Sequence, residues 1–160
     1  MYKAVDVAKF FVNKGIEDQN PVTQMKLQKL VFFAHGLYYA YTEGKEKLIE
    51  EPIEAWKFGP VIPVLYEKYK YFGADPITPE NDVLNFIGKS LDTSETTFDR
   101  KAKELLEETW EQLKYKSAIE LSNWTHQENS AWHKVYRSYD TAIQLRDEDI
   151  LEDFKQFIQQ

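Results

Sequence analysis

Three histidines are the residues of this chain best suited to acid–base or metal chemistry: His35, His126 and His133. A metal site or a nucleophilic site needs several such groups to converge on one point. His126 and His133 are separated by the helix-breaking run Glu128-Asn129-Ser130, and no HExxH, GxSxG, Walker or GxGxxG pattern is present. The chain has no cysteine, which excludes disulfides, thiolate metal sites and Cys nucleophiles. The sequence therefore predicts no metal, no cofactor and no enzyme activity.

One catalytic arrangement stays open, namely a hydrolase in which His126 acts with Glu128 or Ser122. These side chains would have to lie within hydrogen-bonding reach of one another. The alternative roles of the histidines are structural. In that case His126 orients the turn before Trp132, and His35 satisfies a hydrogen bond beside the most apolar helix of the chain.

The distribution of charge disfavours nucleic acid as a direct partner. The net charge is −7, and residues 92–160 carry 9 Lys/Arg against 15 Asp/Glu. An acidic chain repels phosphate, whereas basic proteins suit its C-terminal half. The best basic patch would be Lys26, Lys29 and Lys57, and lysines near a helix start more often only keep a protein in solution. A transcriptional corepressor would accordingly need an accessory DNA-binding protein.

No apolar run approaches the roughly 18 residues that a membrane span requires, and we expect no membrane contact. Charges interrupt any apolar core near Met1–Asp6, so this segment is not a signal peptide. Together with the absence of cysteine, this predicts a cytoplasmic protein.

Aromatic residues make up 15% of the chain and favour a binding module. Trp56, Trp132 and the group Tyr66, Tyr69 and Tyr71 are residue types that anchor protein interfaces. Any single Trp is more often part of a core. Several aromatic residues in loops between helices nevertheless indicate a shared contact surface, and such a surface left uncovered would favour a homodimer.

The element that must position these residues is a helix over Leu27–Tyr41. Its apolar stripe follows the helical period and consists of Leu27, Leu30, Val31, Ala34, Leu37, Tyr38 and Tyr41. Most of its circumference is apolar, which is typical of a central helix, and Thr23 is a suitable N-cap. Only Lys26 and Lys29 are expected to need access to water.

The remaining chain predicts a mainly α fold, a single compact domain over 1–160 of about six helices with at most a small two-stranded β element. The other helices are expected over 2–14, 64–72, 98–113, 118–126 and from Asp147 onward. Gly15 should stop the first of them, Pro63 lies in the first turn of the second, Thr93 or Ser94 should cap the third, and Ser117 opens the fourth with a capping box. The inner face of the last helix is expected to include Phe157 and Ile158. Ala131–Tyr136 adds a further helical turn. Residues 45–62 are expected to be extended, with Pro76–Thr78 as a possible partner strand.

Four motifs follow one another along this framework. They are KLQKL at 26–30, FAHG at 33–36, EAWKFGPVIP at 54–63, and Leu121-Ser122 with His126 and Ala131-Trp132. Together they resemble the Panacea domain, the SocA-like antitoxin domain that also occurs in the phage-associated protein GepA. The resemblance extends over about residues 5–158. The family's last motif usually reads His-x-x-x-x-Pro-Trp, and here Ala131 takes the place of the proline.

The resemblance implies a non-enzymatic, mostly helical protein that neutralises the cognate protein toxin of a toxin–antitoxin system by direct protein–protein binding. The alternative that it implies is a proteolytic adaptor, which delivers its partner to a Clp-type protease. Leu27, Leu30 and Ala34 are expected to be framework. The residues expected to bind the partner are Trp56, Gly59, Pro60, His126 and Trp132, with Lys26 and Lys29 at the rim.

Overall fold

The computed structural model describes residues 1–158 except 84–86 and 89, and in this part of the chain the fold is mainly α. The seven helices of the described residues are α1 (Ala4–Glu17), α2 (Gln24–Tyr41), α3 (Pro63–Tyr69), α4 (Arg100–Leu113), α5 (Ala118–Thr125), α6 (Ala131–Val135) and α7 (Asp147–Lys155). Short 3-10 turns cover Lys70–Phe72 and Pro79–Asn81, and the strands are β1 (Glu54–Trp56) and β2 (Gly59–Val61). The predicted mainly α fold with a small two-stranded β element is confirmed. No helix of the described residues is long and apolar enough to cross a membrane.

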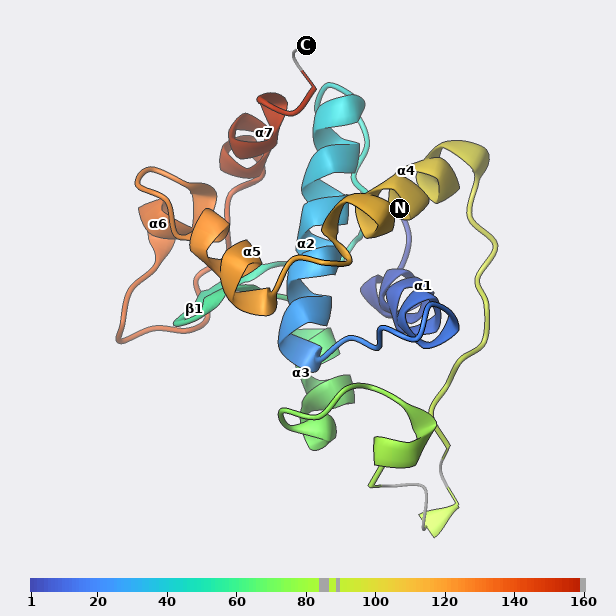
Figure 1. The fold of residues 1–160 in the computed structure, drawn as a ribbon. Coiled ribbons are helices and arrows are strands. Elements are labelled where there is room, and N and C mark those ends of the chain that lie inside the picture. Colours follow the sequence, from blue (N-terminus) through green and yellow to red (C-terminus); the bar gives the residue numbers. More distant parts are fainter. Residues whose placement is uncertain (84–86, 89, 159–160) are drawn as a thin grey trace.

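Helix α2 lies in the middle of the molecule, with α1 and α4 on one side and α5, α6 and α7 on the other (Figure 1). The hydroxyl of Thr23 accepts a hydrogen bond from the backbone N–H of Lys26 at 3.3 Å, which confirms the predicted N-cap. Most of the apolar stripe packs into one continuous core that also receives side chains from α1, α3, α4, α5 and α7. Tyr41 at the end of the stripe is an exception to the prediction, because it is 56% exposed. A largely apolar circumference therefore produces a helix that is covered nearly all round.

The small residue Gly36 allows α7 to approach α2. A Cβ atom at this position would lie 2.2 Å from the ring of Phe154 on α7. That ring sits in an aromatic cluster, with centroids 5.5 Å from both Phe32 and Phe33 and 5.1 Å from Trp124. A side chain larger than hydrogen at position 36 would displace this cluster.

The extended segment folds back on itself as a hairpin. β1 pairs antiparallel with β2, Trp56 opposite Gly59, which leaves a two-residue turn of Lys57 and Phe58. Gly59 has a φ angle of +116°, a value that L side chains rarely adopt. The expectation that Pro76–Thr78 supplies the second strand is wrong, because the N–H of Ile77 instead donates to the carbonyl of Val22.

Two predicted helix boundaries are also wrong. Helix α1 continues through Gly15 to Glu17, and Gly15 serves close packing because a Cβ there would lie 2.9 Å from the Asn20 carbonyl oxygen. Helix α4 is capped by Asp99, whose carboxylate accepts from the N–H of Ala102 at 2.9 Å, and neither Thr93 nor Ser94 caps it.

The C-terminal helix is shorter than expected. α7 ends at Lys155, and Phe157 and Ile158 lie beyond it with 43% and 40% of their surface exposed. Ile150 and Phe154 form the buried inner face as predicted. Pro63 at the start of α3 and the capping box at Ser117 are likewise confirmed.

Candidate functional site

The first and last of the four sequence motifs converge on the β-hairpin, which the third motif forms, and their side chains bond to its backbone carbonyls. The indole N–H of Trp132 on α6 donates to the carbonyl of Trp56 at 2.6 Å. The hydroxyl of Ser122 on α5 donates to the carbonyl of Phe58 at 2.8 Å. Side chains more than sixty positions downstream therefore satisfy the carbonyls of Trp56 and Phe58 on either side of Lys57.

His126 contacts the same turn from the end of α5. Its Nε2 lies 3.3 Å from the carbonyl oxygen of Lys57, and its Nδ1 lies 2.6 Å from that of Ser122. The ring centroid is 3.9 Å from that of Trp132. A neutral imidazole donates from one nitrogen at a time, and a protonated one would donate to both carbonyls.

Lys29 lies beneath the second strand of the hairpin. Its ammonium donates to the carbonyl of Pro60 at 3.2 Å, and only 2% of the residue is exposed. A Cβ atom on Gly59 would come within 2.9 Å of the Lys29 ammonium and 3.0 Å of the Thr125 hydroxyl. The expectation that Lys29 reaches water is therefore wrong, because the hairpin covers it.

Burial also changes the acid–base behaviour of Lys29. No acidic side chain of the described residues forms an ion pair with its ammonium, and desolvation lowers its pKa to about 8. The preceding residue, Gln28, accepts a hydrogen bond from the N–H of Ile62 at 2.8 Å and donates one to its carbonyl at 3.1 Å. We call these five residues the hairpin clamp: Gln28, Lys29, Ser122, His126 and Trp132.

Lys26 is not part of this arrangement. It is half-buried on the other side of the start of α2, where its ammonium donates to the carbonyl of Lys114. Burial lowers its pKa, and the charge of Glu120 acts in the opposite direction. The structure thus brings Lys29, Trp56, Gly59, Pro60, His126 and Trp132 together and places Lys26 at the junction of α4 and α5.

The clamp presents a short exposed turn. Phe58 is 60% exposed, and the ammonium of the exposed Lys57 lies 5.4 Å from the centre of its ring. The ring of Trp56 is half-buried, outside the main core, and packs at 5.0 Å against the partly exposed Tyr66. We call Trp56, Lys57, Phe58 and Tyr66 the tip surface.

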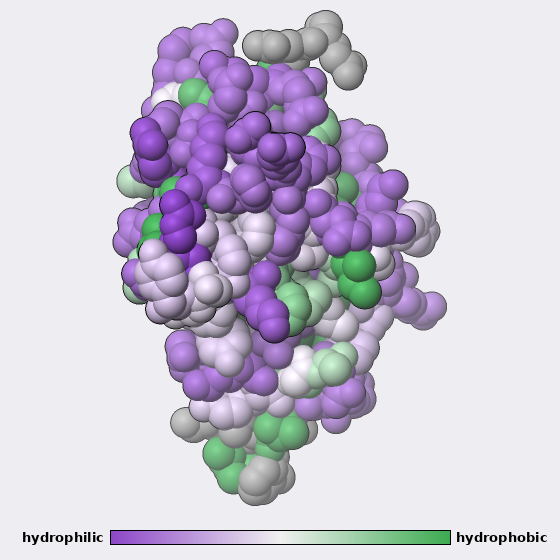
Figure 2. Space-filling view, turned by 90° about the vertical axis from the view of Figure 1, so that its left-hand side faces the viewer, coloured by the Kyte–Doolittle hydropathy of each residue, from purple (hydrophilic) through white to green (hydrophobic). Residues whose placement is uncertain are grey.

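The partner-binding residues expected from the sequence did not include Lys57 and Phe58, and Lys57 was considered only as part of a basic patch. The sequence feature that could have identified them is that only two residues separate Trp56 from Gly59. Two residues are the usual length of a β-hairpin turn, and Trp56 does pair with Gly59. Figure 2 looks onto the side of the molecule with α6, α7 and the hairpin, where less polar residues gather below a strongly hydrophilic upper part.

The proposed hydrolase arrangement is not formed by the three side chains concerned. The Ser122 hydroxyl donates to a backbone carbonyl, and His126 faces the carbonyl of Ser122 and not its hydroxyl. Glu128 lines a separate small pocket with Trp124 and Asn129. Among the described residues, no group of three or more His, Asp or Glu side chains could hold a metal ion.

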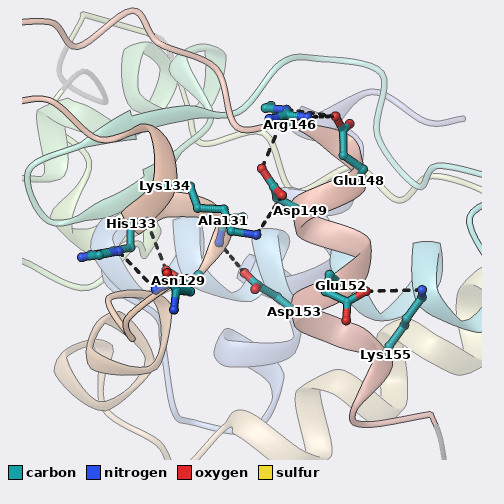
Figure 3. Close-up of polar contacts among 11 residues, drawn as sticks. Asn129, Ala131, His133, Lys134, Arg146, Glu148, Asp149, Glu152, Asp153 and Lys155 are labelled. Atoms are coloured by element: carbon teal, nitrogen blue, oxygen red, sulfur yellow. Dashed lines mark hydrogen bonds and ion pairs between the residues drawn. The ribbon is translucent and has the colours of Figure 1, made fainter.

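Ala131, which stands where the family motif usually has a proline, is bonded to α7 (Figure 3). The N–H of Ala131 donates to the carboxylate of Asp153 at 2.8 Å, a bond that a proline could not make. Nearby, Lys134 on α6 forms an ion pair with Asp149 on α7 at 3.0 Å. Burial raises the pKa of Asp153. Ser130 precedes the site with ψ of 164°, a conformation that also suits a residue before proline.

Comparison with known proteins gives one family. The model of the family "Antitoxin SocA-like, Panacea domain" matches residues 27–133, a range that contains the whole hairpin clamp. The curated Antitoxin SocA of Caulobacter vibrioides (strain NA1000 / CB15N) is 37% identical over 67 residues, or 42% of this chain. The match spans about a third (35%) of that relative's length. No solved structure shows a significant match.

Proposed function

The chain belongs to the family of SocA-like antitoxins with a Panacea domain, and we propose that it acts as an antitoxin which binds a protein toxin and blocks it. The observation that carries this proposal is the hairpin clamp. Residues of two separate family motifs, Lys29 of the first and Ser122 and Trp132 of the last, donate hydrogen bonds to the backbone of one hairpin. The exposed turn of that hairpin carries aromatic and cationic side chains.

A rigid turn suits protein binding better than a mobile one. Fixing the backbone before association reduces the entropy that binding would otherwise cost. Half-exposed aromatic residues such as Trp56 and Phe58 are the residue types that dominate interface energies. The tip surface is therefore proposed as the toxin contact.

The site residues expected from the sequence then divide into two roles. Trp56 contacts the toxin directly. The buried or half-buried Lys29, Gly59, Pro60, His126 and Trp132 act indirectly by fixing the turn. Lys26 lies away from the hairpin and has no part in this contact.

Co-expression with the products of the neighbouring genes tests the proposal. We expect one of these products to arrest growth and the wild-type protein to restore it. Phe58→Ala should abolish the restoration, whereas Tyr115→Ala should not, because Tyr115 is an equally aromatic, 85% exposed residue far along the chain from the hairpin. Growth arrest that persists with the wild-type protein present would refute the antitoxin role.

A cytoplasmic location is part of the proposal and rests on the cysteine-free sequence. Delivery of the partner to a Clp-type protease and homodimer formation stay predictions. The half-life of the partner, measured with and without the protease, would test the first of them.

A further inference from the structure

A second surface lies outside the hairpin clamp, in a groove of about 840 Å³ between α2, α4 and the residues after α7. Its floor is apolar and combines side chains that the core leaves partly uncovered: Leu37, Tyr41, Leu105, Leu113, Phe157 and Ile158. The buried Phe33 also lines it. In Figure 1, α4 lies beside α2, whose C-terminal half supplies one wall. The residues of the hairpin clamp do not line this groove.

One wall of the groove is as long as a short helix. Its α4 wall runs from Lys101 to Leu113, which at 1.5 Å per residue is roughly 18 Å or a little over three turns. The α2 wall contributes three residues spaced by four, Phe33, Leu37 and Tyr41, so that the apolar floor is a long strip. Such a strip fits the apolar face of a helix, with contacts at i, i+3, i+4 and i+7.

The charges on the rim indicate what flanks that helix. Glu104 and Glu108 lie one turn apart on the exposed edge of α4. Glu108 has no cationic partner among the described residues and accepts only from the amide of Gln112. Glu104 pairs with the 92% exposed Arg100, and such surface pairs are readily exchanged. The middle of the rim therefore offers two carboxylates to a basic partner.

The two lysines of the rim do not cancel the attraction of Glu104 and Glu108 for a basic partner. Lys101 is paired with Glu46 at 3.0 Å, and this pair is less exposed than Arg100–Glu104, with 39% and 55% of the two side chains exposed against 92% and 64%. Lys116 lies past the end of α4, about two turns from Glu108, where it suits the negative carbonyl end of a bound helix.

We propose that this groove binds an amphipathic helix of a protein partner, with Lys or Arg residues one turn apart along the flank that faces Glu104 and Glu108. The occupant is defined by its apolar strip and its basic flank. The inference uses residues separate from the tip surface and does not depend on the antitoxin role.

Fluorescence anisotropy with the full chain tests the proposal. The probe is a labelled 14-residue model helix with a leucine strip and two flanking lysines at i and i+4, and the control replaces both lysines by glutamates. We expect the lysine helix to bind roughly tenfold more tightly than the glutamate helix, because like charges across the rim repel. The double variant Glu104→Lys/Glu108→Lys should reverse this order.

Two further variants keep the test decisive. Glu67→Lys/Glu80→Lys makes the same change in net charge on exposed residues away from the groove, and it should leave the order of the two peptides unchanged. Ile158→Asp should weaken both peptides while the circular dichroism stays that of the wild type, since Ile158 is partly exposed.

The proposal is overturned if the two peptides bind equally, if the lysine helix does not bind, or if the control variant alters the preference as much as the groove variant. A concentration-dependent dimer that Ile158→Asp abolishes would assign the groove to a second copy and equally overturn it.

Discussion

At the scale of single residues, Lys29 shows how the fold uses a group that the sequence places on the surface. Its ammonium donates to the carbonyl of Pro60 and lies against Gly59, without an acidic partner in the described part of the chain. A buried charge without a counter-charge is costly, and the cost is reduced when the group is neutral. The hydrogen bond to Pro60 is therefore obtained at the expense of stability.

This cost predicts a pH dependence. The fold holds Lys29 at a pKa of about 8, whereas the ordinary value is 10.5. Between these values the unfolded chain binds more protons, so the free energy of unfolding rises with pH in this window. Between pH 7 and 9.5, the free energy of unfolding of the wild-type protein should rise by up to roughly 2 kcal/mol relative to that of Lys29→Met. Urea unfolding at several pH values measures the difference, and parallel profiles would contradict the assignment.

Gly59 gives a second prediction at this scale. Gly59→Ala combines a positive φ angle with contacts of 2.9 Å to the Lys29 ammonium and 3.0 Å to the Thr125 hydroxyl. Gly73→Ala is a matched control, since its φ is also positive but no atom lies within 4 Å. We expect Gly59→Ala to cost about 1–3 kcal/mol more than Gly73→Ala in denaturant unfolding. Equal costs would show that the hairpin does not pack tightly on Lys29.

At the scale of elements, the junction of α6 and α7 replaces a covalent restraint by a hydrogen bond. In the family pattern a proline would fix the first residue of α6, and here the N–H of Ala131 is bound by Asp153. Proline is favoured at the first position of a helix, and the conformation of Ser130 accommodates it. A proline at position 131 and the hydrogen bond from Ala131 to Asp153 should therefore stabilise the start of α6 in place of each other.

A double-mutant cycle tests this substitution. Asp153→Ala should destabilise the wild-type protein by about 1–2 kcal/mol, because it leaves the N–H of Ala131 without its charged acceptor. In the Ala131→Pro background the same change should cost much less, since no N–H remains there. Thermal unfolding of the four proteins provides the comparison, and an unchanged cost of Asp153→Ala would refute the coupling.

Elements were predictable where local chemistry decides them. The apolar stripe and Thr23 predicted α2, and Ser117 with Glu120 predicted the start of α5. The cap of α4 was misplaced because several residues before Arg100 could serve, and only tertiary contacts select Asp99, whose carboxylate also accepts from Tyr2. The hairpin clamp could not be predicted, since its bonds join carbonyls and side chains that lie up to 76 positions apart.

At the scale of the whole molecule, α2 and the hairpin have separate tasks. Leu30 is fully buried in the common core, whereas Trp56 lies outside it against Tyr66. The helix supports the fold, and the hairpin that it carries is exposed at the tip. Substitutions in the two places should therefore have different consequences.

Leu30→Asp should abolish the fold, because a carboxylate in the core lacks both water and a partner and costs more than about 4 kcal/mol. Trp56→Ala should retain the helical circular dichroism of the wild type. A cooperative unfolding transition measured for both variants checks this contrast. Collapse of Trp56→Ala would make Trp56 a core residue and exclude it from the tip surface.

The most direct test of the account is the dissociation constant for the toxin identified by co-expression, measured for the wild type, Phe58→Ala and Trp56→Ala. Truncation of an interface anchor typically costs 2 kcal/mol or more, so each variant should bind at least roughly 30-fold more weakly while remaining folded. Binding of both folded variants within about twofold of the wild type would contradict the claim that the clamped hairpin presents the toxin-binding surface.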